Sequence, residues 1–227
     1  MKVNLVSYSD AAGTMPANID SIKDLVAYCA RVSNPSNQAN TETSSKLLKY
    51  LIKHKHWSPF EMVNVCMEIE TTRDIARQIL RHRSFSFQEF SQRYANPLSE
   101  LGTERDFEFR EMRMQDPTNR QNSIKPLTLG EAMLEDEWIW RQQETLRVAR
   151  ENYLWAINKG IAKEVARALL PEGLTISKLL MNGTLRSWIH YIELRSANGT
   201  QKEHMDIANE CGKVIAKLYG ENLFAQE

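Results

Sequence analysis

The side chains best suited to chemistry gather in one stretch of the chain, residues 76–94, which reads ARQILRHRSFSFQEFSQRY. Four arginines, one histidine and one glutamate lie there among four aromatic side chains. A guanidinium group binds phosphate or carboxylate with two parallel hydrogen bonds, and aromatic faces stack against rings. The stretch therefore predicts a pocket for an anionic ligand that contains a ring, with a nucleotide as the first candidate.

Part of this cluster has a simpler interpretation. Arg73, Arg77 and Arg81 recur every four residues and share one face of a predicted helix. A solvated, amphipathic helix end explains such a face, and for Arg73 alone it is the better interpretation. It does not explain Arg93, which follows in a stretch with aromatic neighbours, because a partly buried guanidinium needs an anionic partner.

Three other kinds of site are alternatives to a nucleotide pocket. His54 and His56 form a possible metal pair, but no acidic cluster accompanies them at metal-ligand spacing, so we expect no metal. Ser91 has no histidine in a triad-like local motif, so it is a better candidate ligand of phosphate or base than a nucleophile. Arginines interleaved with aromatics are also typical of proteins that bind single-stranded nucleic acid. The 29 basic and 29 acidic residues balance, which argues against a nucleic-acid partner.

The length of 227 residues, 42% of them hydrophobic, fits one globular domain over residues 1–227 or a tight pair of lobes, and we expect a single domain. No run approaches the roughly 18 apolar residues of a membrane span, and the first residues do not resemble a signal peptide. We therefore expect no membrane partner. Cys29, Cys66 and Cys211 are far apart in the sequence, and reduced thiols predict a cytoplasmic protein.

The apolar periodicity predicts an α+β fold in which helices dominate. Alternation predicts strands over 2–8, 62–71 and 174–181, with one more over 107–114. Helical spacing predicts helices over 21–32, 43–54, from 73 onward, 131–158, 162–170, 184–194 and 201–219. The polar, proline-containing residues 95–130 predict a surface excursion that is either functional or mobile.

Several short motifs occur in the order in which one enzyme family carries them. The sequence RHR at 81–83 is followed, after seven residues, by Ser91. The other landmarks are ARVS at 30–33, HKHWSPFE at 54–61, ARQ at 76–78, SQRY at 91–94, EVARALLP at 164–171 and LR at 194–195. In these motifs the chain resembles the flavin-dependent thymidylate synthases over residues 30–205, most weakly at 95–130.

The resemblance implies a fold and a reaction. The fold would be a helix-rich single domain packed on an antiparallel sheet. The family methylates dUMP to dTMP with methylenetetrahydrofolate as the carbon donor, and FAD reduced by NADPH supplies the hydride. The family is usually a homotetramer with active sites shared between subunits, and it uses no attacking cysteine. Cys66 and Cys211 are accordingly expected to be core residues rather than nucleophiles.

The resemblance also assigns site residues, position by position. For dUMP it implies Gln78, Arg81, Glu89, Ser91, Gln92, Arg93, Arg167 and Arg195, with Ser91, Arg93 and Arg195 closest to the chemistry. For the flavin and folate side it implies Ser33, His56, Ser58, Arg81, His82, Arg83, Glu89, Thr184, Arg186 and His190.

Three positions are compared with the family pattern, and a fourth residue is expected to support Arg167. Thr184 stands where the family often has asparagine, and Gly199 stands where some members have histidine. His190 occupies a position at which asparagine or histidine is familiar. Glu164, three residues before Arg167, is expected to form an ion pair with it on a helix.

Overall fold

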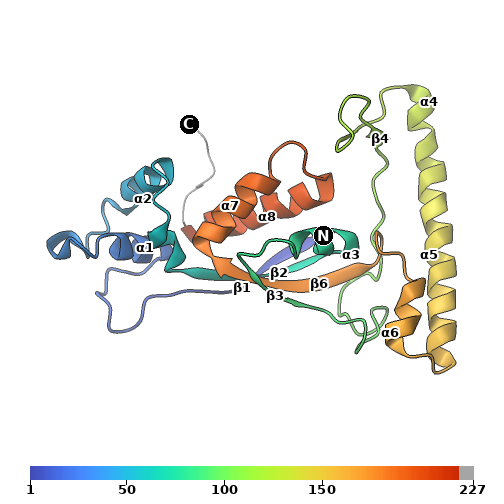
Figure 1. The fold of residues 1–227 in the computed structure, drawn as a ribbon, viewed down its shortest axis with the longest axis horizontal. Helices are drawn as coiled ribbons and strands as arrows, with labels where there is room; N and C mark the ends of the chain where they lie inside the picture. The colour runs from blue at the N-terminus through green and yellow to red at the C-terminus, as the bar shows by residue number, and fades with distance from the viewer. Residues whose placement is uncertain (220–227) are drawn as a thin grey trace.

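A four-stranded antiparallel sheet forms the centre of the protein (Figure 1). The computed structural model describes residues 1–219. The strand order is β1-β2-β6-β3, with bounds Lys2–Tyr8 for β1, Asn64–Thr72 for β2, Ile176–Thr184 for β6 and Ser86–Glu89 for β3. Every neighbouring pair is antiparallel, so the predicted α+β fold on an antiparallel sheet is confirmed.

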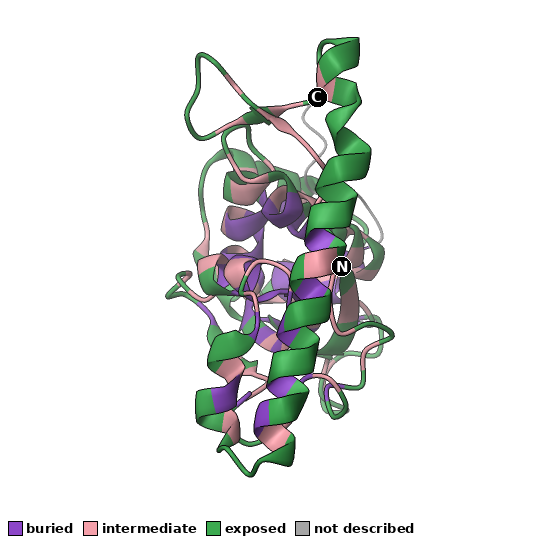
Figure 2. Cartoon of the chain, turned by 90° about the vertical axis from the view of Figure 1, so that its right-hand side faces the viewer, coloured by how far each residue is buried: buried purple, intermediate pink, exposed green. Residues whose placement is uncertain are grey.

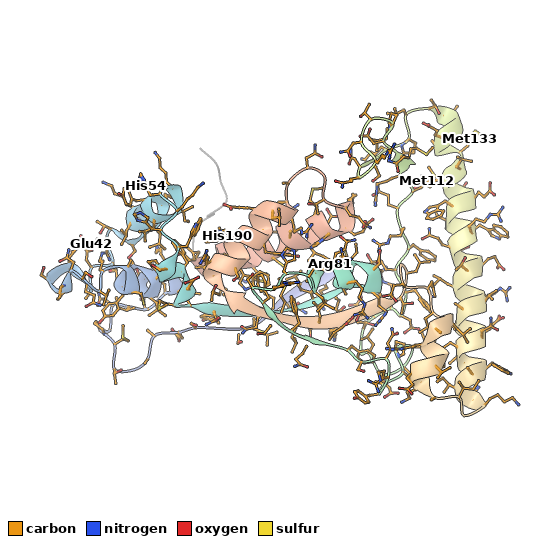
Figure 3. The ribbon with its side chains drawn as sticks, viewed as in Figure 1. Glu42, His54, Arg81, Met112, Met133 and His190 are labelled. Carbon is orange, nitrogen blue, oxygen red and sulfur yellow. The ribbon has the colours of Figure 1, made fainter. Side chains whose placement is uncertain are left out.

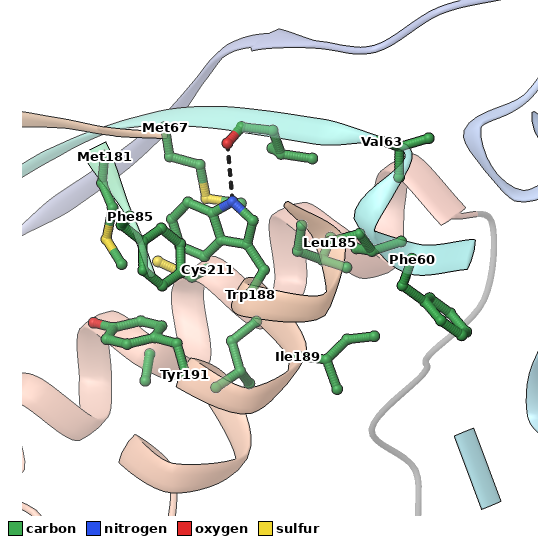
Figure 4. Packing of buried hydrophobic residues seen from close by; sticks show 14 of the residues in the cluster. Phe60, Val63, Met67, Phe85, Met181, Leu185, Trp188, Ile189, Tyr191 and Cys211 are labelled. Carbon is green, nitrogen blue, oxygen red and sulfur yellow. Dashed lines mark hydrogen bonds between the residues drawn. The ribbon is translucent and has the colours of Figure 1, made fainter. Parts of the chain in front are cut away.

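One face of the sheet carries the main core, because alternate residues of the two central strands point the same way. In β2, Val65, Met67 and Ile69 are completely buried. They lie beneath α7 (Leu185–Arg195) and α8 (Lys202–Tyr219), as Figure 4 shows for the side chains around Trp188. The Trp188 indole Nε1 donates to the Val65 carbonyl at 2.9 Å, which ties α7 to the sheet.

Helices occupy both ends of the sheet (Figure 1). At one end lie α1 (Ile22–Ala30), α2 (Ser44–Lys53) and the 3-10 turns η1 (Pro35–Asn37) and η2 (Ser58–Glu61). The short helix α3 (Arg73–Ile79) follows β2 directly. At the other end lie α4 (Leu129–Ala132), α5 (Leu134–Asn158), α6 (Lys163–Ala166) and η3 (Arg167–Leu169).

The long helix α5 buries only a narrow stripe. Leu146, Ala149 and Tyr153 are buried, and Tyr153 forms a second, smaller apolar cluster with Ala156 and nearby residues. Figure 2 shows most of the remaining helix surface as exposed. Large apolar side chains lie on that surface, including Trp140 at 51% exposure. An exposed apolar helix of this kind marks a candidate contact surface.

The excursion over residues 95–130 differs from its sequence prediction. No strand runs over 107–114; the structure has only the short pair β4 (Met114–Gln115) and β5 (Ser123–Ile124), with an isolated bridge from Phe107 to Thr175. The excursion is held by side chains instead, because Arg110 contacts Asp74 at 2.6 Å and Glu203 at 3.2 Å. None of the helices among residues 1–219 is long and apolar enough to cross a membrane.

Two other predicted elements change their limits. The helix predicted over 131–158 is divided, because Thr128 caps α4 with a capping box closed by Glu131, and α5 begins only at Leu134. The helix predicted over 162–170 becomes α6 and the tighter turn η3 ahead of Pro171. Cys66 was expected in the core and is instead half-buried, whereas Cys211 is buried as expected.

Candidate active site

The buried ion pairs around α3 form the foundation of the site. Arg73 is 7% exposed and contacts Glu172 at 3.2 Å and Glu89 at 3.7 Å, so its interpretation as a solvated side chain was wrong. Glu89 also accepts from Arg77 at 3.1 Å and from the Ser177 hydroxyl at 2.9 Å. The Glu89 carboxylate therefore has three protein partners, which link α3 to β3 and β6.

A first group of predicted site residues meets where α3 and α7 end. We call Gln78, Arg81, His82 and Arg195 the helix-end group. Arg195 Nε donates to His82 Nε2 at 3.0 Å. Burial, and secondly the charge of Arg195, lowers the pKa of His82 to about 4. His82 is therefore neutral near pH 7 and can accept from Arg195 rather than repel it.

The arginines of the RHR motif have free guanidinium groups. Arg81 and Arg83 are exposed, and neither side chain forms a hydrogen bond or ion pair within residues 1–219. Figure 3 places Arg81 in the central part of the molecule, away from His54 in the α1–α2 end. Arg195 likewise has no carboxylate partner in the described chain, since its contact is the neutral ring of His82. Three cations that no internal carboxylate neutralises are available to bind an anion.

A second group lies beyond β3, next to α6. We call Ser91, Gln92, Arg93 and Arg167 the α6 group. Arg93 Nε contacts the Glu164 carboxylate at 3.2 Å, whereas Arg167 Nε donates to the Glu164 backbone carbonyl at 3.2 Å. The expected ion pair between Glu164 and Arg167 was therefore wrong.

The side chains of Gln92 and Ser91 in the α6 group have hydrogen-bonding atoms that the described chain leaves without a good partner. Gln92 is 3% exposed, and its Nε2 has no hydrogen-bond partner among residues 1–219. The Ser91 hydroxyl accepts only a long bond, 3.4 Å, from the Arg93 backbone N–H. A buried amide without a partner costs free energy, so an acceptor from a ligand or another chain would be favourable here.

A third group lies between η2 and the start of α7. The Trp57 and His190 rings meet edge to face at 4.5 Å between centroids. Arg186 is ion-paired with Glu61, and the Thr184 hydroxyl caps α7 by accepting from the Ser187 backbone N–H at 3.2 Å. Thr184 is therefore committed to the helix, where its side chain replaces an unmade backbone bond.

The remaining residues predicted on the flavin and folate side are exposed. They are Ser33, His56 and Ser58. The rings of His54 and His56 lie 6.2 Å apart. No group of three or more metal-ligating side chains occurs within the described chain.

The structure does not join the helix-end group to the α6 group. No hydrogen bond, ion pair or ring contact links a member of one to a member of the other within residues 1–219. In Figure 1, α6 lies at one end of the sheet and α7 lies on its covered face. The residues assigned to dUMP therefore form two groups that make no direct contact with each other in the described chain.

The thiols are poor nucleophiles. Burial raises the pKa of Cys29, Cys66 and Cys211 above the ordinary value, and Cys211 is completely buried. All three thiols are therefore protonated near neutral pH, and because the thiolate is the reactive form, none of them is an activated nucleophile.

Three residues of the helix-end region were not found by sequence reasoning: Tyr191, Gln201 and His204. His204 is completely buried and contacts both Tyr191 and Gln78. Its position on the apolar face of the predicted helix over 201–219 was the available signal. Gly199, in the loop before α8, has φ 91°, a conformation that strains a histidine, which accounts for the glycine.

Comparison with known proteins identifies the family. The sequence model of the family described as "Thymidylate synthase complementing protein" matches residues 17–219. A probable flavin-dependent thymidylate synthase of Paramecium bursaria Chlorella virus 1 is 48% identical over 204 residues, 88% of each chain. A flavin-dependent thymidylate synthase of Synechocystis sp. is 44% identical over 222 residues, 96% of each chain.

The fold agrees with that identification. The chain superposes with a TM-score of 0.73 on the crystal structure of a UMP/dUMP methylase, PolB, from Streptomyces cacaoi bound with 5-Br dUMP. The two are 25% identical, and the alignment covers 96% of this chain and 90% of that one. The motifs, the sequence relatives and the fold of this chain all indicate the same family, and the chain belongs to the flavin-dependent thymidylate synthases.

Proposed function

We propose that this chain, as a single domain, catalyses the reductive methylation of dUMP to dTMP. Methylenetetrahydrofolate would be the carbon donor, and NADPH would reduce a bound FAD. The observation that carries the proposal is the set of guanidinium groups without internal carboxylates, Arg81, Arg83 and Arg195. A nucleotide substrate and a dinucleotide cofactor both present phosphates that need such cations.

The residues present fit FAD. The free guanidinium groups of Arg81 and Arg83 suit its pyrophosphate, and the half-buried ring of His190 suits contact with one of its rings. Bound FAD would supply the hydride that completes the methyl group. The chain's own task is to hold and orient the rings and to exclude water around them.

For dUMP, Arg195 would bind the phosphate from the helix-end group and Gln78 would contact the uracil ring. Arg93, with Arg167 and Ser91, would contribute from the α6 group. Arg93 would lie near the negative charge that develops as the ring is activated, because a fixed cation stabilises such a charge without reorganisation. No protein nucleophile is needed, in agreement with the raised pKa values of the thiols.

We infer that one complete site takes its groups from two chains, because the α6 group and the helix-end group make no direct contact within residues 1–219. A homotetramer with shared sites satisfies this requirement. The exposed tryptophans of α5, among them Trp140 and Trp155, support a subunit contact along that helix. The free thiols support a reducing compartment, which is the cytoplasm.

The direct test uses the purified protein. It should be yellow, its flavin absorption should bleach when NADPH is added without oxygen, and it should form dTMP from dUMP and methylenetetrahydrofolate. Omitting NADPH is the matched control and should abolish dTMP. A colourless protein that binds a single-stranded oligonucleotide instead would overturn the proposal in favour of nucleic-acid binding.

A further inference from the structure

A buried histidine touches the glutamine assigned to the uracil ring. His204, in the first turn of α8, has no exposed surface. Its Nδ1 lies 3.3 Å from Gln78 Oε1, and its Nε2 lies 3.2 Å from the Tyr191 hydroxyl. The mechanism proposed above makes no use of His204, yet burying an imidazole in an apolar core is costly unless both nitrogens are satisfied.

The contact with Gln78 Oε1, which can only accept, decides which ring nitrogen of His204 carries the proton. Burial raises the pKa of Tyr191 well above its ordinary value, so its hydroxyl stays protonated. Burial, and then the charge of Arg195, lowers the pKa of His204 to about 3, so its ring is neutral. A neutral ring has one N–H, and Gln78 Oε1 can only accept. Nδ1 therefore donates to Gln78, and Nε2 accepts from Tyr191.

The series of hydrogen bonds continues, donor to acceptor, through the amide of Gln78. Gln78 Nε2 donates to Gln201 Oε1 at 2.8 Å, and Gln201 Nε2 donates to the Glu203 carboxylate at 2.9 Å. Arg113, in the 95–130 excursion, donates to Glu203 at 2.6 Å and so fixes the last acceptor of this series of hydrogen bonds. Each donor meets an acceptor, so reversing any amide would break two contacts at once.

The Gln78 amide is thus held in one orientation, with one Oε1 lone pair and one Nε2 proton left over. Uracil presents a donor, N3–H, beside a carbonyl acceptor, so it matches an amide that offers an acceptor beside a donor. Cytosine presents the reverse, an acceptor at N3 beside an amino donor, and matches the flipped amide. The orientation of Gln78 can therefore select between the two bases.

We propose that His204 is a positioning residue that fixes the orientation of the Gln78 amide and so makes the site selective for uracil over cytosine. The inference rests on the proposed function, because it takes Gln78 as the residue that contacts the uracil ring. It predicts that loss of the His204 side chain reduces the preference for dUMP over dCMP, whereas a general loss of core packing would leave that preference unchanged.

The test compares two changes at His204 with a matched change on the same helix. In His204→Asn the side-chain nitrogen is attached to Cγ, as Nδ1 is, and can still donate to Gln78. His204→Leu has no donor. Ile207→Val, at a residue 1% exposed, serves as the control for general packing loss. Dissociation constants for dUMP and dCMP are measured on the folded holoenzyme of each variant.

In His204→Leu, dUMP should bind about 3- to 10-fold more weakly, the loss expected for one neutral hydrogen bond. The preference for dUMP over dCMP should shrink by at least as much. His204→Asn and the control should keep the preference within about 2-fold, less than the loss of one hydrogen bond. An unchanged preference in folded His204→Leu, or equal weakening of both nucleotides, would overturn the inference. A wild-type protein that binds FAD but no dUMP would instead overturn the proposed function and the inference with it.

A second measurement needs no substrate and no variant. Nitrogen-15 NMR of labelled histidine distinguishes a protonated ring nitrogen from an unprotonated one. His204 should show a proton on Nδ1 and none on Nε2 near neutral pH. A proton on Nε2 would overturn the inference whatever the binding data show, because Nδ1 could then not donate to Gln78.

Discussion

Replacing Arg195 by alanine tests the assignment of the dUMP phosphate. Within residues 1–219 the Arg195 guanidinium contacts the neutral His82 ring at 3.0 Å and no carboxylate. Its charge is therefore available for an anion. A charge-assisted hydrogen bond to a buried anion contributes about 1.5–3 kcal/mol, so Arg195→Ala should weaken dUMP binding by roughly 10- to 150-fold.

The same change has a second, independent consequence at His82. Burial is the larger cause of its lowered pKa, and the charge of Arg195 is the smaller. Removing the charge should raise the pKa of His82 above about 4 but leave it below its ordinary value of 6.5, because the ring stays buried. A pH titration followed by NMR measures this shift without any ligand.

Calorimetry with dUMP and the flavin absorbance of the purified protein complete the assay. FAD content should hardly change in Arg195→Ala. Lys213→Ala is the matched control, because Lys213 is an exposed cation on α8 and is paired with Glu210, so it should alter neither binding nor His82. Loss of flavin with normal dUMP affinity would refute the assignment of Arg195 to the phosphate. An unchanged His82 pKa would refute the electrostatic contact.

The assembly, the thiols and the buried histidine each give one further prediction. Mixed Arg93→Ala and Arg195→Ala proteins should form dTMP that neither forms alone, since a shared site can then combine the intact groups of two chains; a fully active monomer in light scattering would contradict this. A folded variant without thiols should keep most of its turnover despite a stability loss of about 1–2 kcal/mol, and binding of FAD and dUMP without any dTMP would refute the reaction without a cysteine. That variant carries Cys29→Ser, Cys66→Ala and Cys211→Ala. The free energy of unfolding should fall as the pH decreases from about 7 to about 5, because the unfolded chain protonates His204 near its ordinary value of 6.5, whereas the folded protein does so only near its pKa of about 3. Urea unfolding should show a shallower decrease for His204→Leu, and an equal decrease would count against the buried, neutral ring.

Three of the four strands and the covering helices could be predicted because their patterns are regular, whereas the short strand β3 was missed. Met67 and Ile69 alternate with polar residues in β2, and that alternation places them in the core. The excursion over 95–130 was not predictable in the same way. Its position depends on Arg110, which contacts Asp74 and Glu203, residues distant in the sequence on both sides. Local periodicity contains no information about such contacts.

The site could be predicted as a set of residues but not as an arrangement. The motif around RHR identified Arg81 and Arg83, and both have free guanidinium groups in the described chain. The motif also placed Glu89 among ligand-binding residues, although its carboxylate is engaged by arginines of α3. A carboxylate that faces a ligand and one that supports a helix look the same in a sequence, because both lie near arginines.

Glu164 shows most directly why spacing was insufficient. A separation of three residues on a helix favours an ion pair with Arg167, but α6 ends at Ala166 and the chain tightens into η3. The Glu164 carboxylate is then free to pair with Arg93, 71 residues away, at 3.2 Å. Arg93 is thereby held beside α6, apart from Arg195 at the end of α7. In the proposed assembly dUMP meets these two arginines from two chains, so mixing the two alanine variants tests the assembly itself.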